Sequence, residues 1–300
     1  MKKILLLGAS SLTITIARQI EKDNDLLLLG IIGNLDLVDG ELKKFYLGKD
    51  INLIYTINPD ITIAIDFDKI LGSEIINSFT IINSHGSILP DYKGMHSLGW
   101  AFINGESEVG YTIHIINEFL DEGPILFQDK FKIGKTTTFN NIKDNIIESI
   151  EFNLLKVVKG YLNHSIIPVP QTNNSGIRYV AKRNIADCYI DFKWSTEFID
   201  RFIRALSPPK GPGAFTVFKN KKLIILEVEK YECSPYFEVP GHILLRDKNK
   251  ILVKTGDGCI WIKKVEYESN SANASEIITS QGLRLGINLL DEKLKDLGII

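Results

Sequence analysis

The sequence predicts an α/β fold in which a mostly parallel, Rossmann-like sheet flanked by helices precedes a small C-terminal β-barrel of OB-like type. Two patterns carry this prediction. In the first part of the 300-residue chain, short apolar runs alternate with helical patterns, as in layered α/β proteins. Beyond Pro208-Pro209 the pattern changes to short β runs separated by turns, which is typical of small barrels. We therefore expect one domain over residues 1–200 and a barrel domain over residues 201–300.

The first domain is expected to alternate buried strands with helices. Its apolar runs are short and continuous, which is typical of parallel strands buried on both faces. Apolar residues also recur at helical spacing along two longer segments. The expected strands cover residues 4–8, 26–32, 61–65, 79–82, 109–117 and 124–133, and the expected helices cover residues 12–22 and 138–160.

The second domain is expected to follow a linker and a short helix. A proline-marked stretch at residues 167–170, with turn-rich residues 172–176 behind it, is the best linker candidate. Gly256-Asp257-Gly258 is a strong hairpin signal between the last two strands. The expected helix covers residues 196–206, and the expected strands cover residues 214–218, 222–229, 242–245, 251–254 and 259–265.

The composition excludes several classes of protein. The 35 Lys and Arg against 37 Asp and Glu leave a charge of −2, which argues against nucleic-acid binding through bulk electrostatics. No apolar run approaches the ~18 residues needed to cross a bilayer, so no membrane insertion is expected. The start Met1-Lys2-Lys3 could open a signal peptide, but polar residues dilute the apolar run behind it. The three cysteines show no CxxC spacing, and we expect a cytoplasmic protein.

Side chains suited to catalysis gather between residues 83 and 121. Asn83 and His85 stand two apart at the carboxyl end of an expected strand, so both leave on one face, roughly 6–7 Å apart. Ligands of open α/β sheets bind beyond such strand ends. Acyl transfer to an amine needs a donor for the oxyanion and an acceptor for the amine proton, which an amide and an imidazole supply. Asp121, before Gly123, can orient the imidazole, although each of the three is also a common turn residue.

A metal site is the competing interpretation of the same region. His85, His96, His114 and Asp121 have ligand types that suit zinc. They lack a short paired spacing such as H-x-x-x-H and come from widely separated elements. His114 also lies in an alternating strand, where a hydrogen-bonded, half-buried side chain explains it. We therefore expect no metal.

The run from Asn83 to Gly94 reads N-S-H-G-S-I-L-P-D-Y-K-G and resembles the signature of the folate-dependent N-formyltransferase family. That family carries N-x-H-x-S-(I/L)-L-P-x-x-(R/K)-G, then a Trp-containing helix, a G-x-T-x-H strand and a D-x-G-P loop. The same pieces follow here in order, at Trp100, at residues 110–114 and at residues 121–124. The pattern is closest to nucleotide-sugar N-formyltransferases of the UDP-4-amino-4-deoxy-arabinose type and to methionyl-tRNA formyltransferases.

The resemblance continues through residues 204–216 and 254–258, which are similar to the junction and a hairpin of the family's C-terminal barrel. It implies that residues 1–200 form the catalytic domain and that 10-formyltetrahydrofolate is the donor. It also implies that Asn83, His85 and Asp121 form the catalytic triad. The folate contacts that it implies, by position, are Phe67, Ile70, Leu71, Ser87, Ile88, Leu89 and Pro90.

Two departures from the family pattern bear on the acceptor. Methionyl-tRNA formyltransferases usually carry a basic, glycine-containing insertion after the second strand, whereas residues 30–49 contain Asp36, Asp39, Glu41 and only three lysines. Met95-His96-Ser97 also replaces a small residue and a proline in a segment that lines the acceptor pocket of relatives. With the charge of −2, these departures favour the amine of a UDP- or dTDP-linked amino sugar, used to make a surface glycan.

Six side chains are candidates for contact with this acceptor. The charged ones are explained equally well as solvated surface residues, and the tryptophan as packing for its helix. The candidates are Lys93, Met95, His96, Trp100, Arg183 and Arg204. Two other functions stay open: a methionyl-tRNA formyltransferase, and a non-catalytic module that binds folate or a nucleotide sugar. A homodimer is expected because it is common among relatives that act on sugars.

Overall fold

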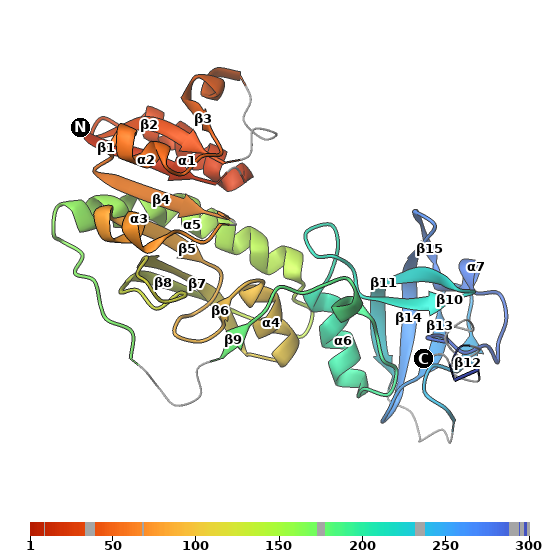
Figure 1. Ribbon diagram of the computed structural model, residues 1–300. Helices are drawn as coiled ribbons and strands as arrows, with labels where there is room; N and C mark the ends of the chain where they lie inside the picture. Colours follow the sequence, from red (N-terminus) through yellow and green to blue (C-terminus); the bar gives the residue numbers. More distant parts are fainter. Residues whose placement is uncertain are drawn as a thin grey trace. The chain divides into compact units, whose positions relative to one another are not determined.

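The computed structural model describes residues 1–8, 10–33, 40–67, 69–172, 178–231, 238–287, 294 and 297–298 (Figure 1). Contacts within the chain divide it into two units. The first unit comprises Met1–Ala101, Glu108–Lys132 and Asp144–Ala181, and the second comprises Phe102–Ser107, Ile133–Lys143 and Lys182–Ile300. A domain boundary at residue 200 stays a prediction.

A seven-stranded sheet organises the first unit. Its strands are β1 (Lys2–Leu7), β2 (Leu26–Ile32), β3 (Tyr46–Gly48), β4 (Ile61–Ile65), β5 (Ile81–His85), β7 (Glu108–Ile115) and β8 (Ile125–Lys132). Their order is β3-β2-β1-β4-β5-β7-β8, as Figure 1 shows. The first five strands in this order run parallel, and β7 and β8 each run antiparallel to the neighbour before them. The sheet is therefore mostly parallel, as predicted.

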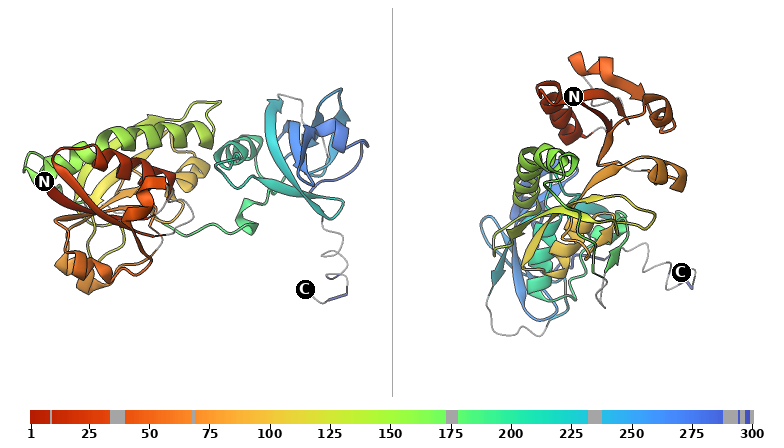
Figure 2. Two further views of the ribbon diagram at one scale, coloured as in Figure 1. Left: turned by 90° about the horizontal axis from the view of Figure 1, so that it is seen from above. Right: turned by 90° about the vertical axis from the view of Figure 1, so that its left-hand side faces the viewer.

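Helices cover both faces of this sheet. Figure 2 shows α1 (Ser11–Glu21) and α5 (Phe139–Leu162) on one face, with α2 (Leu53–Ile57) and α3 (Ser73–Ser78) on the other. On the face of α2 and α3, side chains of β1 pack with Ile54 and Ile75 in one buried cluster. Residues 4–7 of β1 are fully buried, because a central parallel strand is covered on both faces.

The turn from β1 into α1 has a strict local requirement. Gly8 has φ +120°, and a Cβ there would lie 2.0 Å from the carbonyl oxygen of Ile65, so only glycine fits. Ser10 caps the helix by accepting from the Thr13 backbone N–H at 3.3 Å. The apolar start, the glycine and the serine thus specify a strand, a turn and a helix.

The second unit is a curled antiparallel sheet with helix α6 (Thr196–Ala205). The strands are β10 (Phe215–Phe218), β11 (Lys221–Tyr231), β12 (Ile243–Arg246), β13 (Ile251–Lys254), β14 (Cys259–Tyr267) and β15 (Asn270–Asn273). Their order is β10-β11-β14-β13-β12, and β15 pairs with β14. The sheet curls into a half-barrel (Figure 1), so the expected fold class is confirmed.

The hairpin predicted at Gly256-Asp257-Gly258 joins β13 to β14 and also caps α6. The carboxylate of Asp257 accepts from the Thr196 backbone N–H at 2.7 Å. Gly256 donates its N–H to the Trp194 carbonyl at 2.9 Å, and a Cβ on it would lie 2.0 Å from the carbonyl oxygen of Lys193. One turn therefore closes a hairpin and satisfies a helix N–H group.

The differences from the predicted elements have a local cause. The strand expected at residues 79–82 lies at residues 81–85, because Phe79 still belongs to the end of α3, where its N–H bonds the Ile75 carbonyl. Several short elements had no prediction, among them β3, α2, α3 and β15. These four are three to six residues long, too short for a periodic pattern. The linker candidate falls partly on residues 173–177, which lie outside the described residues.

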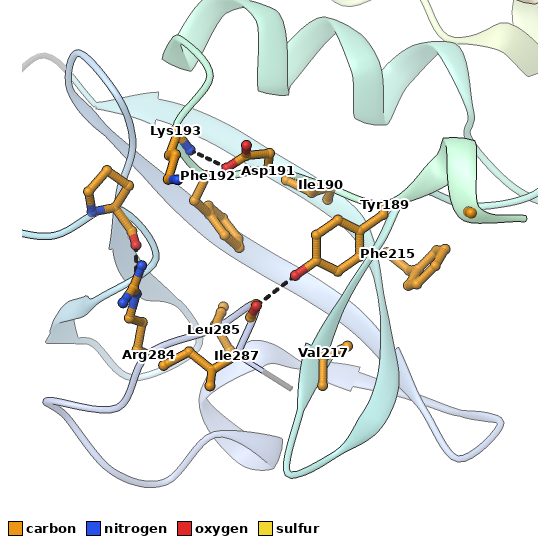
Figure 3. Close-up of a pocket in the computed structure, with 13 residues that line it drawn as sticks. Tyr189, Ile190, Asp191, Phe192, Lys193, Phe215, Val217, Arg284, Leu285 and Ile287 are labelled. Atoms are coloured by element: carbon orange, nitrogen blue, oxygen red, sulfur yellow. Dashed lines mark hydrogen bonds between the residues drawn. The ribbon is translucent and has the colours of Figure 1, made fainter. Parts of the chain in front are cut away.

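A cavity of about 740 Å³ opens in the second unit (Figure 3). Tyr189, Lys193 and Arg284 are among the side chains that line it. The Tyr189 hydroxyl donates to the Gly286 carbonyl at 2.7 Å, and Arg284 Nε donates to the Pro240 carbonyl at 3.1 Å. No member of the predicted triad lines this cavity.

No helix in the described part of the chain is long and apolar enough to span a membrane, and a cytoplasmic location stays a prediction.

Candidate active site

Asn83 and His85 lie at the carboxyl end of β5, between the parallel strand β4 and the antiparallel strand β7. Their side chains share one face of the sheet because alternate residues of a strand point the same way. In the register with β7, Asn83 stands opposite His114 and His85 stands opposite Thr112. The strand pairing thus places a second imidazole beside the Asn83 amide.

His114 holds the Asn83 amide in one orientation. Its Nε2 lies 3.1 Å from Asn83 Nδ2, and its Nδ1 lies 3.1 Å from the carbonyl oxygen of Ile115. Because a carbonyl can only accept, Nδ1 carries the hydrogen and Nε2 accepts from the amide. Burial lowers the pKa of His114 to about 4, against the opposing effect of the Asp121 carboxylate. The ring is therefore neutral near pH 7, and the second amide hydrogen of Asn83 can donate to a bound ligand.

His85 lies between a carbonyl and a carboxylate. Its Nε2 is 2.9 Å from the carbonyl oxygen of Tyr92, and its Nδ1 is 3.4 Å from Asp121 Oδ2. Nε2 therefore donates, while Nδ1 faces a group that can only accept. The side chain is 8% exposed, so little water competes for these contacts. This ring can hold a proton against Asp121 and pass it to a neighbouring group.

Asp121 lies in the loop between β7 and β8, in a conformation with φ +52°. Its Oδ2 accepts from the Gly94 backbone N–H at 2.8 Å, which fixes the carboxylate toward His85. Gln171 Nε2 donates to the carbonyl oxygens of Asp121 and Gly123, both at 2.8 Å. A Cβ on Gly123 would lie 1.6 Å from the carbonyl oxygen of Ile115, so the loop passes the strand too closely for any other residue.

An amide, an imidazole and a carboxylate therefore meet where a parallel strand ends. The His85 and His114 rings are edge to face with centroids 6.4 Å apart, and both face Asp121, whose Oδ1 lies 3.7 Å from His114 Nε2. The amide can stabilise an oxyanion and the imidazole can move a proton, which suits acyl transfer to nitrogen. Within the described ranges no three His, Cys, Asp or Glu side chains are arranged to hold a metal ion. His96, a member of the metal alternative, is exposed.

The segment after His85 is fixed by hydrogen bonds from β7 and β8. The Leu89 N–H donates to Thr112 Oγ1 at 3.0 Å, and Gln128 Nε2 donates to the Leu89 carbonyl at 2.8 Å. Ser87 is buried, and its hydroxyl donates to the Asp91 carbonyl at 2.7 Å. Ile88 and Pro90, the other predicted folate contacts of this segment, are half-buried.

The loop after β4 carries the other three predicted folate contacts in very different surroundings. Leu71 is buried in the core cluster with α2 and α3, and Phe67 packs against that cluster. Ile70 is 97% exposed. The folate-binding roles of these residues stay predictions.

Four of the predicted acceptor contacts lie close together in the first unit. Lys93 is fully buried, and its ammonium lies 2.9 Å from the Glu122 carboxylate. Met95 and His96 are exposed, and Trp100 Nε1 donates to the Ala181 carbonyl at 2.8 Å. The acceptor-binding roles of all four stay predictions.

The two arginines on the same list belong to the second unit. Arg204 Nε lies 3.0 Å from Asp200 Oδ2, and its Nη1 donates to the Thr137 carbonyl at 2.8 Å. Burial lowers the pKa of Arg183 from its ordinary value. Their acceptor-binding roles also stay predictions.

Sequence reasoning missed several residues around the triad. The sequence indicates His114 only as a metal candidate or a half-buried strand residue, because its contact with Asn83 depends on a strand register that the sequence does not display. Gln171 reaches the Asp121 loop from 50 residues away. Glu122 and Tyr179, which share a hydrogen bond, carried no signal beyond the neighbourhood of Asp121.

Two sequence profiles match the chain. The profile described as Formyl transferase matches residues 46–158, and the one described as Formyl transferase, C-terminal domain, matches residues 184–282. Curated relatives include the methionyl-tRNA formyltransferase of Clostridium tetani, 31% identical over 242 residues that cover 80% of this chain and 77% of the relative. The protein of the same name from Clostridium beijerinckii is 32% identical over 213 residues, covering 70% and 68%.

Solved structures share the fold at lower identity. WlaRD, a sugar 3N-formyl transferase, matches with a TM-score of 0.67 and 24% identity, over 88% of this chain and 97% of its own. HypX from Aquifex aeolicus in complex with tetrahydrofolic acid matches with a TM-score of 0.65 and 18% identity, over 92% of this chain and 47% of its own. The methionyl-tRNA formyltransferase from Clostridium thermocellum matches with a TM-score of 0.59 and 20% identity, over 77% of this chain and 94% of its own.

The expected acceptor, a nucleotide-linked amino sugar, is wrong. Curated relatives about 31% identical over most of the chain are methionyl-tRNA formyltransferases, whereas the sugar formyltransferases resemble the chain in fold alone. The charge argument failed because a net charge is a sum and does not report where charges lie on a surface. Asp36 and Asp39, on which it also relied, lie outside the described residues. The expected homodimer stays a prediction.

Profiles, relatives and geometry agree on the chemistry. The matched ranges include the signature run and all three triad residues, and the structure brings those residues together. The formyl donor is 10-formyltetrahydrofolate, the donor of the formyl transferase family to which the matched profiles belong. The chain belongs to the formyl transferase family and is a folate-dependent formyl-transfer enzyme.

Proposed function

We propose that this enzyme is a methionyl-tRNA formyltransferase, which moves the formyl group of 10-formyltetrahydrofolate onto the α-amino group of methionyl-tRNA. The observation that carries the proposal is the 31% identity, over 80% of the chain, with a curated protein of that activity. The first unit supports it with a site suited to formyl transfer onto nitrogen.

The reaction exchanges one carbon–nitrogen bond for another. The methionyl nitrogen attacks the formyl carbon, and the carbonyl oxygen takes up negative charge in the tetrahedral intermediate. The bond between that carbon and N10 of the folate then breaks. The proton lost by the amine ends on N10, so the products are formylmethionyl-tRNA and tetrahydrofolate. The enzyme has to stabilise the oxyanion and carry one proton.

The triad residues divide these tasks. Asn83, oriented by His114, offers an amide hydrogen to the oxyanion. His85 carries the proton, and the Asp121 carboxylate 3.4 Å from its Nδ1 orients the ring and stabilises its charged form. In the structure Nε2 donates to the Tyr92 carbonyl, which helps to fix the ring in this orientation.

The folate is proposed to lie along residues 87–90, beside the triad. The Leu89 backbone donates to Thr112 and accepts from Gln128, and these fixed contacts support a preformed site. Phe67, Ile70 and Leu71 are proposed as contacts from the neighbouring loop.

A formylation assay tests the proposal directly. Purified enzyme is supplied with 10-formyltetrahydrofolate and initiator tRNA charged with labelled methionine, and formylmethionine is measured after deacylation. We expect formylation that depends on the charged tRNA and weakens steeply as salt is raised, since phosphate contacts are lost. His85→Ala should abolish turnover while folate binding, measured by calorimetry, persists.

The clostridial relatives provide the reference for a negative result. If the Clostridium tetani enzyme formylates the same tRNA preparation and the present enzyme does not, the proposed function is wrong. If His85→Ala keeps turnover, the function can stand but the assignment of the proton carrier fails.

A further inference from the structure

A short segment from the end of the first unit lies alongside the end of the signature run. β9 (Tyr179–Val180) pairs in parallel with β6 (Lys93–Gly94). The Lys93 N–H donates to the Arg178 carbonyl at 3.0 Å, and the Met95 N–H donates to the Val180 carbonyl at 3.2 Å. We call residues 178–181 the crossing segment.

The contact between the two strands leaves no room for a side chain at the glycine. Gly94 has φ +101°, and a Cβ on it would lie 2.3 Å from the carbonyl oxygen of Val180. The loop and the crossing segment are therefore held at one separation.

Side chains lock the same contact beside the catalytic loop. Glu122, the residue after Asp121, accepts from Lys93 Nζ at 2.9 Å and from the Tyr179 hydroxyl. Lys93 Nζ also lies 5.3 Å from the centroid of the Tyr179 ring. The Lys93 side chain is 1% exposed, so the Glu122 carboxylate is its important partner: a buried ammonium left unpaired is strongly destabilising. We call Lys93, Glu122 and Tyr179 the clasp.

The loop held by the clasp is the one that positions two members of the triad. The carbonyl of Tyr92 accepts from His85 Nε2, and the N–H of Gly94 donates to the Asp121 carboxylate at 2.8 Å. Lys93 lies between these two backbone groups in the chain. Any shift of Lys93 therefore moves the partner of His85 and the partner of Asp121 together.

We propose that Lys93, Glu122 and Tyr179 are positioning residues for formyl transfer, which set the His85–Asp121 pair through the backbone of residues 92–94. This assigns Lys93 a role other than the acceptor contact considered from the sequence. The kinetic part of the test rests on the proposed function, because it uses methionyl-tRNA as the acceptor.

Charges near the clasp are few and mostly exposed. Arg178 pairs with Asp91 at 3.2 Å, with both side chains more than 40% exposed, and this pair is worth little in water. The groups that face His85 are Asp121, the neutral ring of His114 and the Tyr92 carbonyl. The clasp reaches His85 only through the backbone of residues 92–94, so breaking it is expected to change the positions of His85 and Asp121.

The kinetic test uses Tyr179→Phe, Glu122→Gln and the double variant. Each single variant should lower kcat about tenfold, since small displacements of reacting groups cost this much, with KM for both substrates within about twofold. The double variant should also lower kcat only about tenfold, because both changes break the same network of contacts. Lys93→Arg should keep most of the activity. Tyr55→Phe, an exposed hydroxyl deletion on α2, is the matched control and should leave kcat unchanged.

A second readout does not need the acceptor. In wild-type enzyme labelled with nitrogen-15 in histidine, the Nε2 proton of His85 should exchange slowly with water, because it is buried on the Tyr92 carbonyl. In Tyr179→Phe this exchange should accelerate about tenfold, as the carbonyl loses its fixed position. Circular dichroism checks that every variant is folded.

Four results would overturn the proposal. Two concern kcat: a value within about twofold of wild type in Glu122→Gln, or a double variant whose loss of kcat is the product of the two single losses. The third is a raised KM for the tRNA with unchanged kcat, and the fourth is unaltered proton exchange at His85 in Tyr179→Phe. The third would mean that Lys93 and its partners bind the acceptor.

If wild-type enzyme fails to formylate methionyl-tRNA, the proposed function fails, and the exchange experiment alone decides the role of the clasp.

Discussion

His114 makes the stability of this enzyme depend on pH in a predictable direction. Its ring is buried and neutral, accepts from Asn83 and donates to the Ile115 carbonyl. Protonation would replace an acceptor with a donor facing the amide, so the folded state resists it. Burial accordingly lowers the pKa of His114 to about 4, whereas a histidine in the unfolded chain titrates near 6.5.

The size of the effect follows from these two values. Between pH 6.5 and pH 4 the unfolded state binds more protons than the folded state, so the free energy of unfolding falls as the pH is lowered through this range. The linkage relation gives a loss of about 2 kcal/mol between pH 7 and pH 5 from this one side chain. The loss is complete, at about 3 kcal/mol, once the pH passes below the folded value.

Urea unfolding at pH 7 and at pH 5 measures the effect. The wild type should lose about 2 kcal/mol more between the two conditions than His114→Gln, which has no ring to protonate. A uniform destabilisation of the variant does not matter, because the comparison is between the two pH values. His164→Gln removes an exposed histidine near the end of α5 and should behave as wild type. If His114→Gln shows the same loss as wild type, the neutral buried ring is not its source and the reasoning fails.

Three further substitutions test the loops that support the two units. Gly123→Ala should leave little activity or folded protein, judged by circular dichroism and turnover, because its Cβ would lie 1.6 Å from the Ile115 carbonyl. Gln171→Ala should lower kcat about tenfold with native spectra, since two carbonyls of the catalytic loop lose their donor; a normal kcat would contradict this. Asp257→Ala should lower the free energy of unfolding by about 0.5–1 kcal/mol in urea, because an exposed cap on the Thr196 N–H is lost.

Much of the fold was predictable because the deciding patterns are local. Residues 4–7 form a short continuous apolar run, which is typical of a strand covered on both faces, and the following glycine and serine indicate a turn and a helix start. The hairpin at residues 256–258 was predictable for the same reason. Elements of three to six residues, such as β3 and α3, were not, because they owe their conformation to the core beneath them.

The candidate site was predictable in part. Asn83 and His85 are neighbours on one strand face, so their proximity follows from strand geometry alone. Asp121 was included because it precedes a glycine in a loop and because the signature pattern names it. The contact of Asn83 with His114 was hidden, since it depends on which residue of β7 stands opposite β5.

The wrong prediction of the acceptor has a physical cause. Net charge and the charge of one short segment do not describe the surface that meets the acceptor. A long polyanion responds to the local field of the face it touches, and that field is set by the arrangement of charges in space. The sequence supplies only their sum.

The order of residues along the chain alone determined the alternation of strands and helices, the turn glycines and the pairing of an amide with an imidazole on one strand. Each depends on neighbours within a few positions, where backbone geometry leaves few choices. Only the tertiary structure decided that His114 would orient Asn83, that Gln171 would hold the Asp121 loop, and that Lys93 would meet Glu122 and Tyr179. Those contacts join segments up to 86 residues apart (Lys93 to Tyr179), and strand register and core packing bring them together.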